Sequence, residues 1–360
     1  MSDIKVNSIS SLSGSNGPVI SGIATMVSSG AMTLPRGDTA FRDGRMGRGL
    51  FAGGFNSPLG NIVNISYIQI STTGNTQIFG DLSQKRDNLG GFGSSTRGVF
   101  GGGNVSPDDT NIIDYVTISS TGSAADFGDL STTKQGMFSV SNNVRGIFAG
   151  GNDSPIYYPD IEYVTIASKG NSSYFGDMIE KRSYAAAAGS STRGLLPGGS
   201  TPGPTNYKAI EYVTFATTGN SKDFGDLVYS GQNGGVRRQT GAVSNSTRCL
   251  IGGGYCPGAT SNIEYVTIAS LGDGLDFGDL NFVRNSDGSL RSSAAKMIGA
   301  SVSNSIRGVF AGGQFPGSPG HQNIIEYVNI ATLGDGILFG DLPLAMYSMG
   351  GCSDSHGGIG

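Results

Sequence analysis

The sequence predicts an all-β protein built from six copies of one four-stranded unit, and three observations predict it. Glycine makes up 61 of the 360 residues, and each glycine inside a helix costs roughly 0.5–1 kcal/mol relative to alanine. Three short motifs recur six times in the same order. The spacing between two of these motifs never changes, as expected for strands joined by a tight hairpin. A mainly helical protein is therefore excluded.

The three motifs mark equivalent positions in every repeat. The first is Arg-Gly, two apolar residues, one variable residue and a Gly-Gly pair, with Cys249 in place of the first glycine in one copy, and it begins at Arg48, Arg97, Arg145, Arg193, Arg248 and Arg307. The second resembles Ile-Glu-Tyr-Val-Thr-Ile, with its tyrosine at 67, 115, 163, 212, 265 and 327. The third is Phe-Gly-Asp-Leu/Met, with its phenylalanine at 79, 127, 175, 224, 277 and 339.

Each unit of about 48 residues is predicted to hold four short strands. In the second copy they are residues 89–95, 97–103, 113–118 and a strand that ends at 127–130. The first strand is rich in Gly, Ala and Ser, the residue types that crowding around a central axis requires. Four-stranded units in radial array form a β-propeller, so six units predict six blades. A linear β-solenoid is the alternative, although its coils are usually shorter than this period.

Either end of the chain could complete the first blade. Residues 346–360 align with the first strand of a repeat and place His356 in the arginine position, and residues 31–47 offer a competing strand. The propeller is expected over residues 41–360. Residues 1–40 lack all three motifs and alternate apolar residues with Ser, Thr and Gly. They are predicted to form an extended arm for attachment or oligomerisation, the alternative being a disordered leader.

Composition excludes several classes of function. The net charge is −4 without long runs of one sign, which argues against nucleic-acid or anionic-membrane binding by bulk charge. No apolar run is long enough to span a bilayer, and three cysteines make no disulfide framework, so folding in a reducing cytoplasm is expected. With two histidines and no tryptophan, neither a His-rich metal site nor a sialidase motif can form. We therefore predict no enzyme and no cofactor, and a solvated turn at residues 106–109 in preference to a Ca²⁺ site.

The repeated residues have a structural interpretation. The Gly-Gly pairs are expected to form bends and close blade contacts, because no helix or lysine follows them as in a phosphate-binding loop. The repeated tyrosines and phenylalanines are expected to pack between blades, and Cys249 and Cys256 to be buried as small apolar residues. The six arginines of the first motif are expected to contact the six aspartates of the third, at positions 81, 129, 177, 226, 279 and 341.

The connections of variable length predict a binding surface. In a four-stranded meander, the links between strands two and three and between consecutive blades lie on the same face, and these are the links that vary here. Binding residues concentrate on loops held by a rigid scaffold, and Tyr and Arg are enriched at recognition sites. The candidates are Tyr157, Tyr158, Tyr207, Tyr229, Arg237, Arg238, Tyr255, Phe282, Arg284, Phe315 and His321. The alternative is that these long loops vary without a binding role.

The repeats resemble kelch repeats, with Phe where kelch repeats usually carry Trp. They are more closely similar to kelch-like virion structural proteins of cyanophages and related marine tailed phages, on the strings TRGVFGGG, NIEYVTIA and DFGDL, the early GPVISG and the terminal SDSHGG. The resemblance covers nearly the whole chain and implies a tail, fibre or baseplate component without an assigned active site.

The function expected from this resemblance is structural and non-enzymatic. The propeller would be displayed on the virion, which is assembled in the host cytoplasm, and would bind a host-surface glycan or protein. The arm would hold it to other virion proteins or to sister subunits in a homo-oligomer, with no nucleic acid and no membrane insertion. The alternatives are a decoration protein without a receptor role and a polysaccharide-active propeller enzyme.

Overall fold

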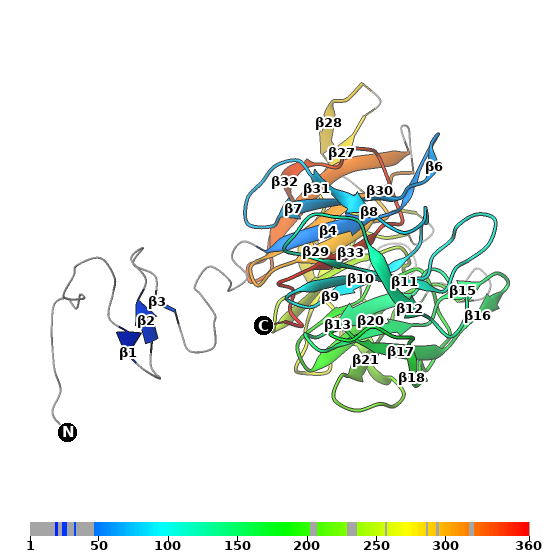
Figure 1. Ribbon diagram of the computed structural model, residues 1–360. Coiled ribbons are helices and arrows are strands. Elements are labelled where there is room, and N and C mark those ends of the chain that lie inside the picture. Colours follow the sequence, from blue (N-terminus) through cyan, green and yellow to red (C-terminus); the bar gives the residue numbers. More distant parts are fainter. Residues whose placement is uncertain are drawn as a thin grey trace.

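The computed structural model describes most of the chain as six four-stranded antiparallel sheets arranged as a six-bladed β-propeller (Figure 1). The described residues are 47–201, 207–228, 236–255, 258–285, 287–292, 295–316 and 320–359, with three short strands before them. Those strands, β1 (Val19–Ile20), β2 (Ala24–Met26) and β3 (Met32–Thr33), pair with one another. They lie within the predicted arm.

Each blade is a meander that runs from an inner strand to an outer strand. Blade 1 runs through β33 (Gly350–Ser353), β4 (Arg48–Ala52), β7 (Asn64–Gln69) and β8 (Gln77–Asp81); blade 2 through β9 (Gly90–Gly93), β10 (Arg97–Gly101), β11 (Ile112–Thr117) and β12 (Ala125–Asp129); blade 3 through β13 (Phe138–Ser141), β14 (Arg145–Ala149), β17 (Asp160–Thr165) and β18 (Ser173–Asp177). Blade 4 runs through β19 (Ala188–Gly189), β20 (Arg193–Pro197), β21 (Ala209–Thr214) and β22 (Lys222–Asp226); blade 5 through β23 (Gly241–Ser244), β24 (Arg248–Gly252), β25 (Asn262–Thr267) and β26 (Leu275–Asp279); blade 6 through β29 (Ala300–Ser303), β30 (Arg307–Gln314), β31 (His321–Asn329) and β32 (Ile337–Asp341). The order of the four predicted strands is confirmed in all six copies.

The inner strands form a closed ring around a central channel. Each contacts the inner strand of the next blade, and β33 contacts both β29 and β9. Three further two-stranded hairpins stand in the connections: β5 (Phe55–Asn56) with β6 (Gly60–Asn61), β15 (Asn152–Asp153) with β16 (Ile156–Tyr157), and β27 (Phe282–Arg284) with β28 (Leu290–Ser292). The propeller is thus radial, and the solenoid alternative is wrong.

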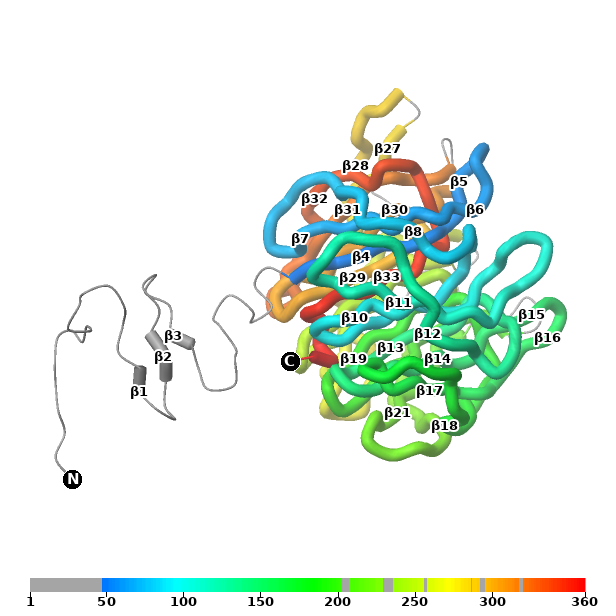
Figure 2. The backbone as a smooth tube through the Cα atoms, viewed as in Figure 1, coloured from blue at the N-terminus to red at the C-terminus, as the bar shows by residue number. Residues whose placement is uncertain are grey.

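The carboxyl terminus completes the first blade. Strand β33 pairs with β4 in the register Gly351–Phe51, and Figure 2 shows the red end of the chain meeting the blue first blade. Because β4 pairs with β33 on one side and β7 on the other, residues 31–47 have no free edge of β4 to occupy. The alignment that put His356 in the arginine position is wrong, because Arg48 fills that position in blade 1 and the chain turns inward after Asp354.

Aromatic residues form the core, through contacts within each blade as well as the expected contacts between blades. Each repeated tyrosine packs edge-on against the phenylalanine of its own blade, with ring centroids 5.9–6.1 Å apart. The phenylalanines are buried in clusters that combine residues of two neighbouring blades, such as Phe79 with Phe100 and Val116. Cys249 and Cys352 are also buried, while Cys256 lies outside the described residues.

The expected contact between the repeated arginines and aspartates is wrong. Among the described residues, none of these six arginines forms an ion pair with any of the six aspartates. Each guanidinium lies instead over the tyrosine of its own blade, 4.4–4.9 Å from the ring centroid. Its Nη1 donates to a backbone carbonyl of the next blade at 2.5–3.4 Å. The pattern closes with Arg307 and Ile70, so each arginine is held to its own blade by a cation–π contact and joins the next blade by a charge-assisted hydrogen bond.

Candidate ligand-binding face

The two variable connections of every blade lie on one face, as the sequence predicts. In each blade an isolated β-bridge joins the link that precedes the inner strand to the loop that follows the second strand, for example Asp87 with Asn104 and Gln135 with Asn152. Equivalent bridges occur in the other four blades. In Figure 1 the β15–β16 hairpin lies at the right of the propeller, whereas the carboxyl terminus lies at its left. We call the surface formed by these connections the variable face.

A ring of backbone hydrogen bonds surrounds the channel where it opens on the variable face. Asn88 N–H donates to Ser348, Gly136 to Asn88, Tyr184 to Gly136 and Gln239 to Tyr184, at 2.5–2.8 Å. Two further bonds, from Ile298 to Gln239 and from Met349 to Gly299, complete the circle at 3.0 Å. Each blade therefore contributes one segment to a hydrogen-bonded rim.

Side chains on this rim are held in an unusual backbone conformation. Asn88, Tyr184, Gln239 and Ser348 have φ angles of 53°, 58°, 53° and 57°, a region that L-residues other than Gly, Asn and Asp seldom adopt. Such conformations cost about 1–3 kcal/mol and concentrate at functional sites. The strain turns polar side chains toward the channel from four different blades.

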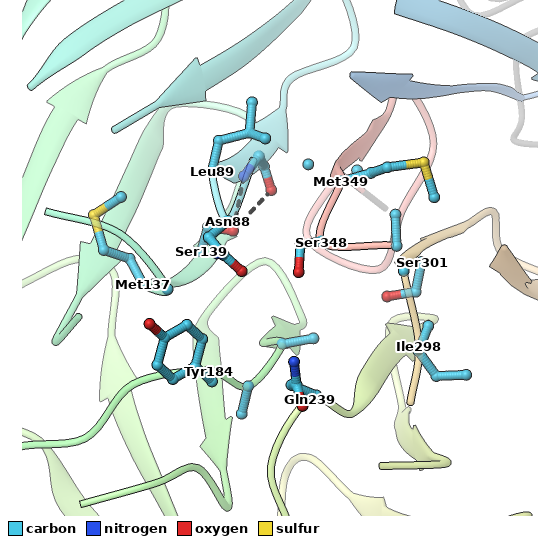
Figure 3. Close-up of a pocket in the computed structure, with 18 of the residues that line it drawn as sticks. Asn88, Leu89, Met137, Ser139, Tyr184, Gln239, Ile298, Ser301, Ser348 and Met349 are labelled. Atoms are coloured by element: carbon cyan, nitrogen blue, oxygen red, sulfur yellow. Dashed lines mark hydrogen bonds between the residues drawn. The ribbon is translucent and has the colours of Figure 1, made fainter. Parts of the chain in front are cut away.

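These side chains line a cavity of about 110 Å³ at the mouth of the channel. Figure 3 shows Asn88, Tyr184, Gln239 and Ser348 around it, with Met137, Ile298 and Met349 between them. Amide, hydroxyl and phenol groups offer both donors and acceptors, and small-molecule sites combine such groups with apolar walls. The cavity is chemically suited to an uncharged polar ligand.

The opposite end of the channel is filled by the carboxyl-terminal tail. His356 Nε2 lies 2.8 Å from the carbonyl oxygen of Gly93, and its Nδ1 accepts from Gly358 N–H at 3.1 Å. Gly357 N–H donates to Ser244, on another inner strand, at 3.1 Å. These bonds require the neutral imidazole with its proton on Nε2, and burial lowers the pKa of His356. The tail thus crosses the channel from one blade to another.

A buried carboxyl group adjoins the cavity. Asp87 is 7 % exposed, and burial, opposed by its own backbone N–H and reinforced by Asp109, raises its pKa to about 6. Asn88 Nδ2 donates to Asp87 and, at 2.9 Å, to Gln135. Burial and the charges of Asp153 and Asp108 also raise the pKa of Asp109, against hydrogen bonds from Asn104 and Gln135. The described residues hold no group of three or more His, Cys, Asp or Glu arranged for a metal ion.

An aromatic cluster joins blades 1 and 6 on the variable face. The His321 ring lies 4.7 Å from Tyr347 and 6.2 Å from Phe55, centroid to centroid, and Phe55 lies 5.5 Å from Tyr347. All three side chains are half-buried, and burial lowers the pKa of His321. His321 is among the predicted residues, whereas Phe55 and Tyr347 are not.

The other predicted residues are mostly half-buried groups with their own partners. Lys134 lies over Tyr158, Arg182 over Tyr207, Arg238 over Tyr255 and Arg291 over Phe315, at 5.3–5.6 Å. Arg284 pairs with Asp341 at 2.7 Å, Phe282 lies on β27 and Tyr157 on β16. Tyr229 lies outside the described residues. The structure therefore distributes these residues around the variable face and does not bring them into one site.

Arg237 is not a binding residue. It is buried, and its Nη2 lies 2.7 Å from Glu264. Removing a buried cation from its carboxylate would leave an uncompensated charge. Its role is structural, and the prediction that it binds a ligand is wrong.

Sequence reasoning missed five buried ion pairs, of which Arg237–Glu264 is one. The others are Arg86–Asp114, Lys134–Glu162, Arg182–Glu211 and Lys296–Glu326. Each joins the link before an inner strand to the third strand of the same blade. Blade 1 lacks the pair, because Met346 and Ser66 occupy the two positions. The signal was present, since each of the five basic residues precedes the arginine of the first motif by 11 residues.

Comparison with known proteins assigns the chain to no family, since neither a family model nor a curated protein matches it. No helix among the described residues is long and apolar enough to cross a membrane. A function is consequently inferred from the fold and from the variable face.

Proposed function

We propose that this chain is a non-enzymatic structural protein of a tailed-phage virion that binds a host-surface glycan through its variable face. The virion role rests on the resemblance of the repeats. The binding role rests on one observation above all: six blades direct their variable connections to one face, around a polar cavity. The amino-terminal arm would hold the propeller to other virion proteins or to sister subunits.

The chemistry of the variable face favours a sugar as the ligand. Sugar rings present hydroxyls for amide and hydroxyl groups, which the cavity supplies through Asn88, Gln239 and Tyr184. They also present apolar faces for aromatic rings, which the Phe55, His321 and Tyr347 cluster supplies. Aromatic side chains offer a large contact area together with a polar tip. A branched glycan could contact both places.

Binding of the purified chain to a glycan array tests the proposal directly. We expect Tyr157→Ser/Tyr158→Ser or Phe55→Ser/Tyr347→Ser to weaken binding of the best glycan at least tenfold. Tyr174→Ser is the matched control, because Tyr174 is 63 % exposed on the outer strand β18, outside the variable face. Equal losses in the control variant, or no glycan bound by the parent chain, contradict the binding role.

The virion role is tested by a separate experiment. Mass spectrometry of purified phage particles should detect the chain in stoichiometric amount. Its absence from particles contradicts the virion role whatever the glycan array shows.

One observation favours a second candidate, a polysaccharide-cleaving enzyme. Asp87 accepts a hydrogen bond from Asn88 of the cavity, its pKa is raised to about 6 by burial and by the charge of Asp109, and glycoside hydrolysis uses two carboxyl groups of which one is a raised-pKa acid. Release of reducing ends from a bound polysaccharide, abolished by Asp87→Asn, would establish this candidate and exclude the non-enzymatic one.

A further inference from the structure

At two equivalent positions, blades 5 and 6 expose large apolar side chains where the other four blades carry polar residues or alanine. Leu271 and Leu333 precede the glycine of the turn between the third and fourth strands, and Leu275 and Ile337 begin the outer strands. Their exposed fractions are 60 %, 61 %, 56 % and 47 %. The equivalent residues of blades 1 to 4 are Thr73, Gln77, Thr121, Ala125, Lys169, Ser173, Thr218 and Lys222. We call the four apolar residues the Leu/Ile surface.

The contact between blades 5 and 6 makes this surface a continuous strip. Gly334, next to Leu333, donates its N–H to the carbonyl of Phe277, two residues after Leu275, at 3.0 Å. Gly336 in the same turn donates to Asp279 at 2.7 Å. The turn of blade 6 therefore lies directly on the outer strand of blade 5. Exposed apolar strips of this kind mark interaction surfaces on soluble proteins.

The chain enters the propeller on the side where the turns of this strip lie. Gly47 is the first residue of the continuous described chain, and its carbonyl accepts from Ile70 N–H of blade 1 at 2.7 Å. An added Cβ at Gly47 would lie 3.2 Å from the Cβ of Asn304, in the first turn of blade 6. The continuous described chain consequently begins between blades 6 and 1, on the side opposite the variable face.

The amino-terminal segment has the chemistry to cover the strip. No Asp, Glu, Lys or Arg occurs between Lys5 and Arg36, and residues 18–35 read PVISGIATMVSSGAMTLP. Strands β1 to β3 within this stretch have only two, three and two residues. Strands of two or three residues are shorter than most strands of globular proteins, so contact with another surface would help to hold them. The Leu/Ile surface and this stretch without charged residues belong to the same chain.

Reach and charge are compatible with contact within one chain. Residues 34–46 can span up to about 43 Å at roughly 3.3 Å per residue, enough to pass from the entry point to the adjacent blades. They carry Arg36, Arg42 and Arg45 together with Asp38 and Asp43, so their net charge is only slightly positive, whereas the turns of the strip expose Asp273 and Asp335. Tethering also raises the effective concentration of the segment to the millimolar range. A contact within the chain is therefore favoured over one with a second copy.

We propose that the Leu/Ile surface holds residues 18–35 of the same chain against blades 5 and 6. The variable face then points away from the attached segment, and residues 1–17 remain available for an attachment partner. This contact goes beyond the binding role proposed above, because it concerns the opposite side of the propeller and needs no ligand.

Hydrogen exchange of the full chain, followed by mass spectrometry, tests the contact. We expect amides of residues 18–35 to exchange at least tenfold more slowly than in a peptide of that sequence. The variant Leu271→Thr/Leu275→Ser/Leu333→Thr/Ile337→Ser, which introduces residue types found in the other blades, should abolish this protection without changing exchange in β9 to β14. Ile78→Ser/Val144→Ser is the control, because these exposed residues lie outside the strip.

Three results would overturn the proposal. Residues 18–35 could exchange as fast as the free peptide, or the control variant could remove protection as fully as the strip variant. Protection could also rise with protein concentration while sedimentation shows a dimer, which would make the occupant a second copy. A failure to bind glycans leaves all these readouts unchanged, so the two proposals are tested separately.

Discussion

At the scale of the residue, the surroundings of each carboxyl group decide its charge. Burial alone would raise the pKa of Glu162, but Lys134 and hydrogen bonds from Ser172 and Ser131 outweigh it, and the pKa is lowered to about 2. Asp87 is buried without a cation, and its pKa is raised to about 6. The pKa values of two buried acids are thus shifted in opposite directions.

Ionisation of Asp87 is expected to oppose folding. Its pKa in the folded chain lies above the value of 3.8 for a free aspartate, so the native state binds the proton more tightly and stability falls as pH rises from about 4 to above 6. Asp87→Asn should therefore match the parent near pH 4 and exceed it near pH 8, by up to about 3 kcal/mol. Urea unfolding across this range measures the difference.

The exposed Asp108 supplies the control for this experiment. Asp108→Asn should leave the pH dependence as it is in the parent chain. A stability curve for Asp87→Asn that runs parallel to the parent from pH 4 to pH 8 would show that Asp87 ionises normally in the folded protein.

At the scale of the element, each blade link is fixed to the third strand by a buried charge pair, except in blade 1. Met346 and Ser66 replace the cation and the carboxylate together, and Met346 packs with Leu342 and Met349 in an apolar cluster. Buried ion pairs can often be exchanged for neutral residues without loss, whereas removal of one partner is strongly destabilising. This chain contains both arrangements, an ion pair in blades 2 to 6 and a neutral pair in blade 1.

Introducing the neutral residues of blade 1 into blade 4 tests whether the buried ion pair can be replaced. Arg182→Met alone leaves Glu211 buried without its cation and should cost about 3–5 kcal/mol. Arg182→Met/Glu211→Ser should recover at least half of that loss, although Arg182 also donates to the carbonyls of Ala209 and Leu196. A double-mutant cycle by chemical denaturation gives the coupling. A double variant no more stable than the single one would mean that the backbone contacts of Arg182, and not the pair, hold the link.

The strands could be predicted from sequence because their motifs keep a fixed spacing, whereas the rim could not, and the constant spacing of the buried cations was overlooked. The unchanging distance from tyrosine to phenylalanine defines a hairpin whose register cannot shift. The link that contains Arg237, between blades 4 and 5, is longer than the links that follow blades 1 to 3. From sequence, Arg237 is therefore interpreted as one of several loop residues. The rim depends on backbone angles at Tyr184 and Gln239, and no residue type signals a left-handed conformation there. Whether the arginines of the first motif contact a carboxylate or a tyrosine likewise depends on how neighbouring blades are placed.

At the scale of the whole molecule, stability depends on closure of the ring by β33. This strand brings the last residues of the chain against β4, and Ser353 Oγ donates to Ser303 on the inner strand of blade 6 at 2.7 Å. Without β33 the edge of β4 would be exposed, and an exposed edge strand promotes pairing with other chains. Closure also places Arg48 N–H on Asp354 at 2.8 Å.

Two nested truncations separate the closing strand from the tail that fills the channel. A chain ending at Asp354 keeps β33 and loses only the tail, so it should unfold in one cooperative transition at a slightly lower temperature. A chain ending at Met349 loses β33 as well, and we expect an early, broad transition with aggregation, because blade 1 then has three strands and the ring is open. Scanning calorimetry and light scattering measure both. If the two truncated chains unfold alike, the tail across the channel, and not the pairing of β33 with β4, is what holds the ring closed.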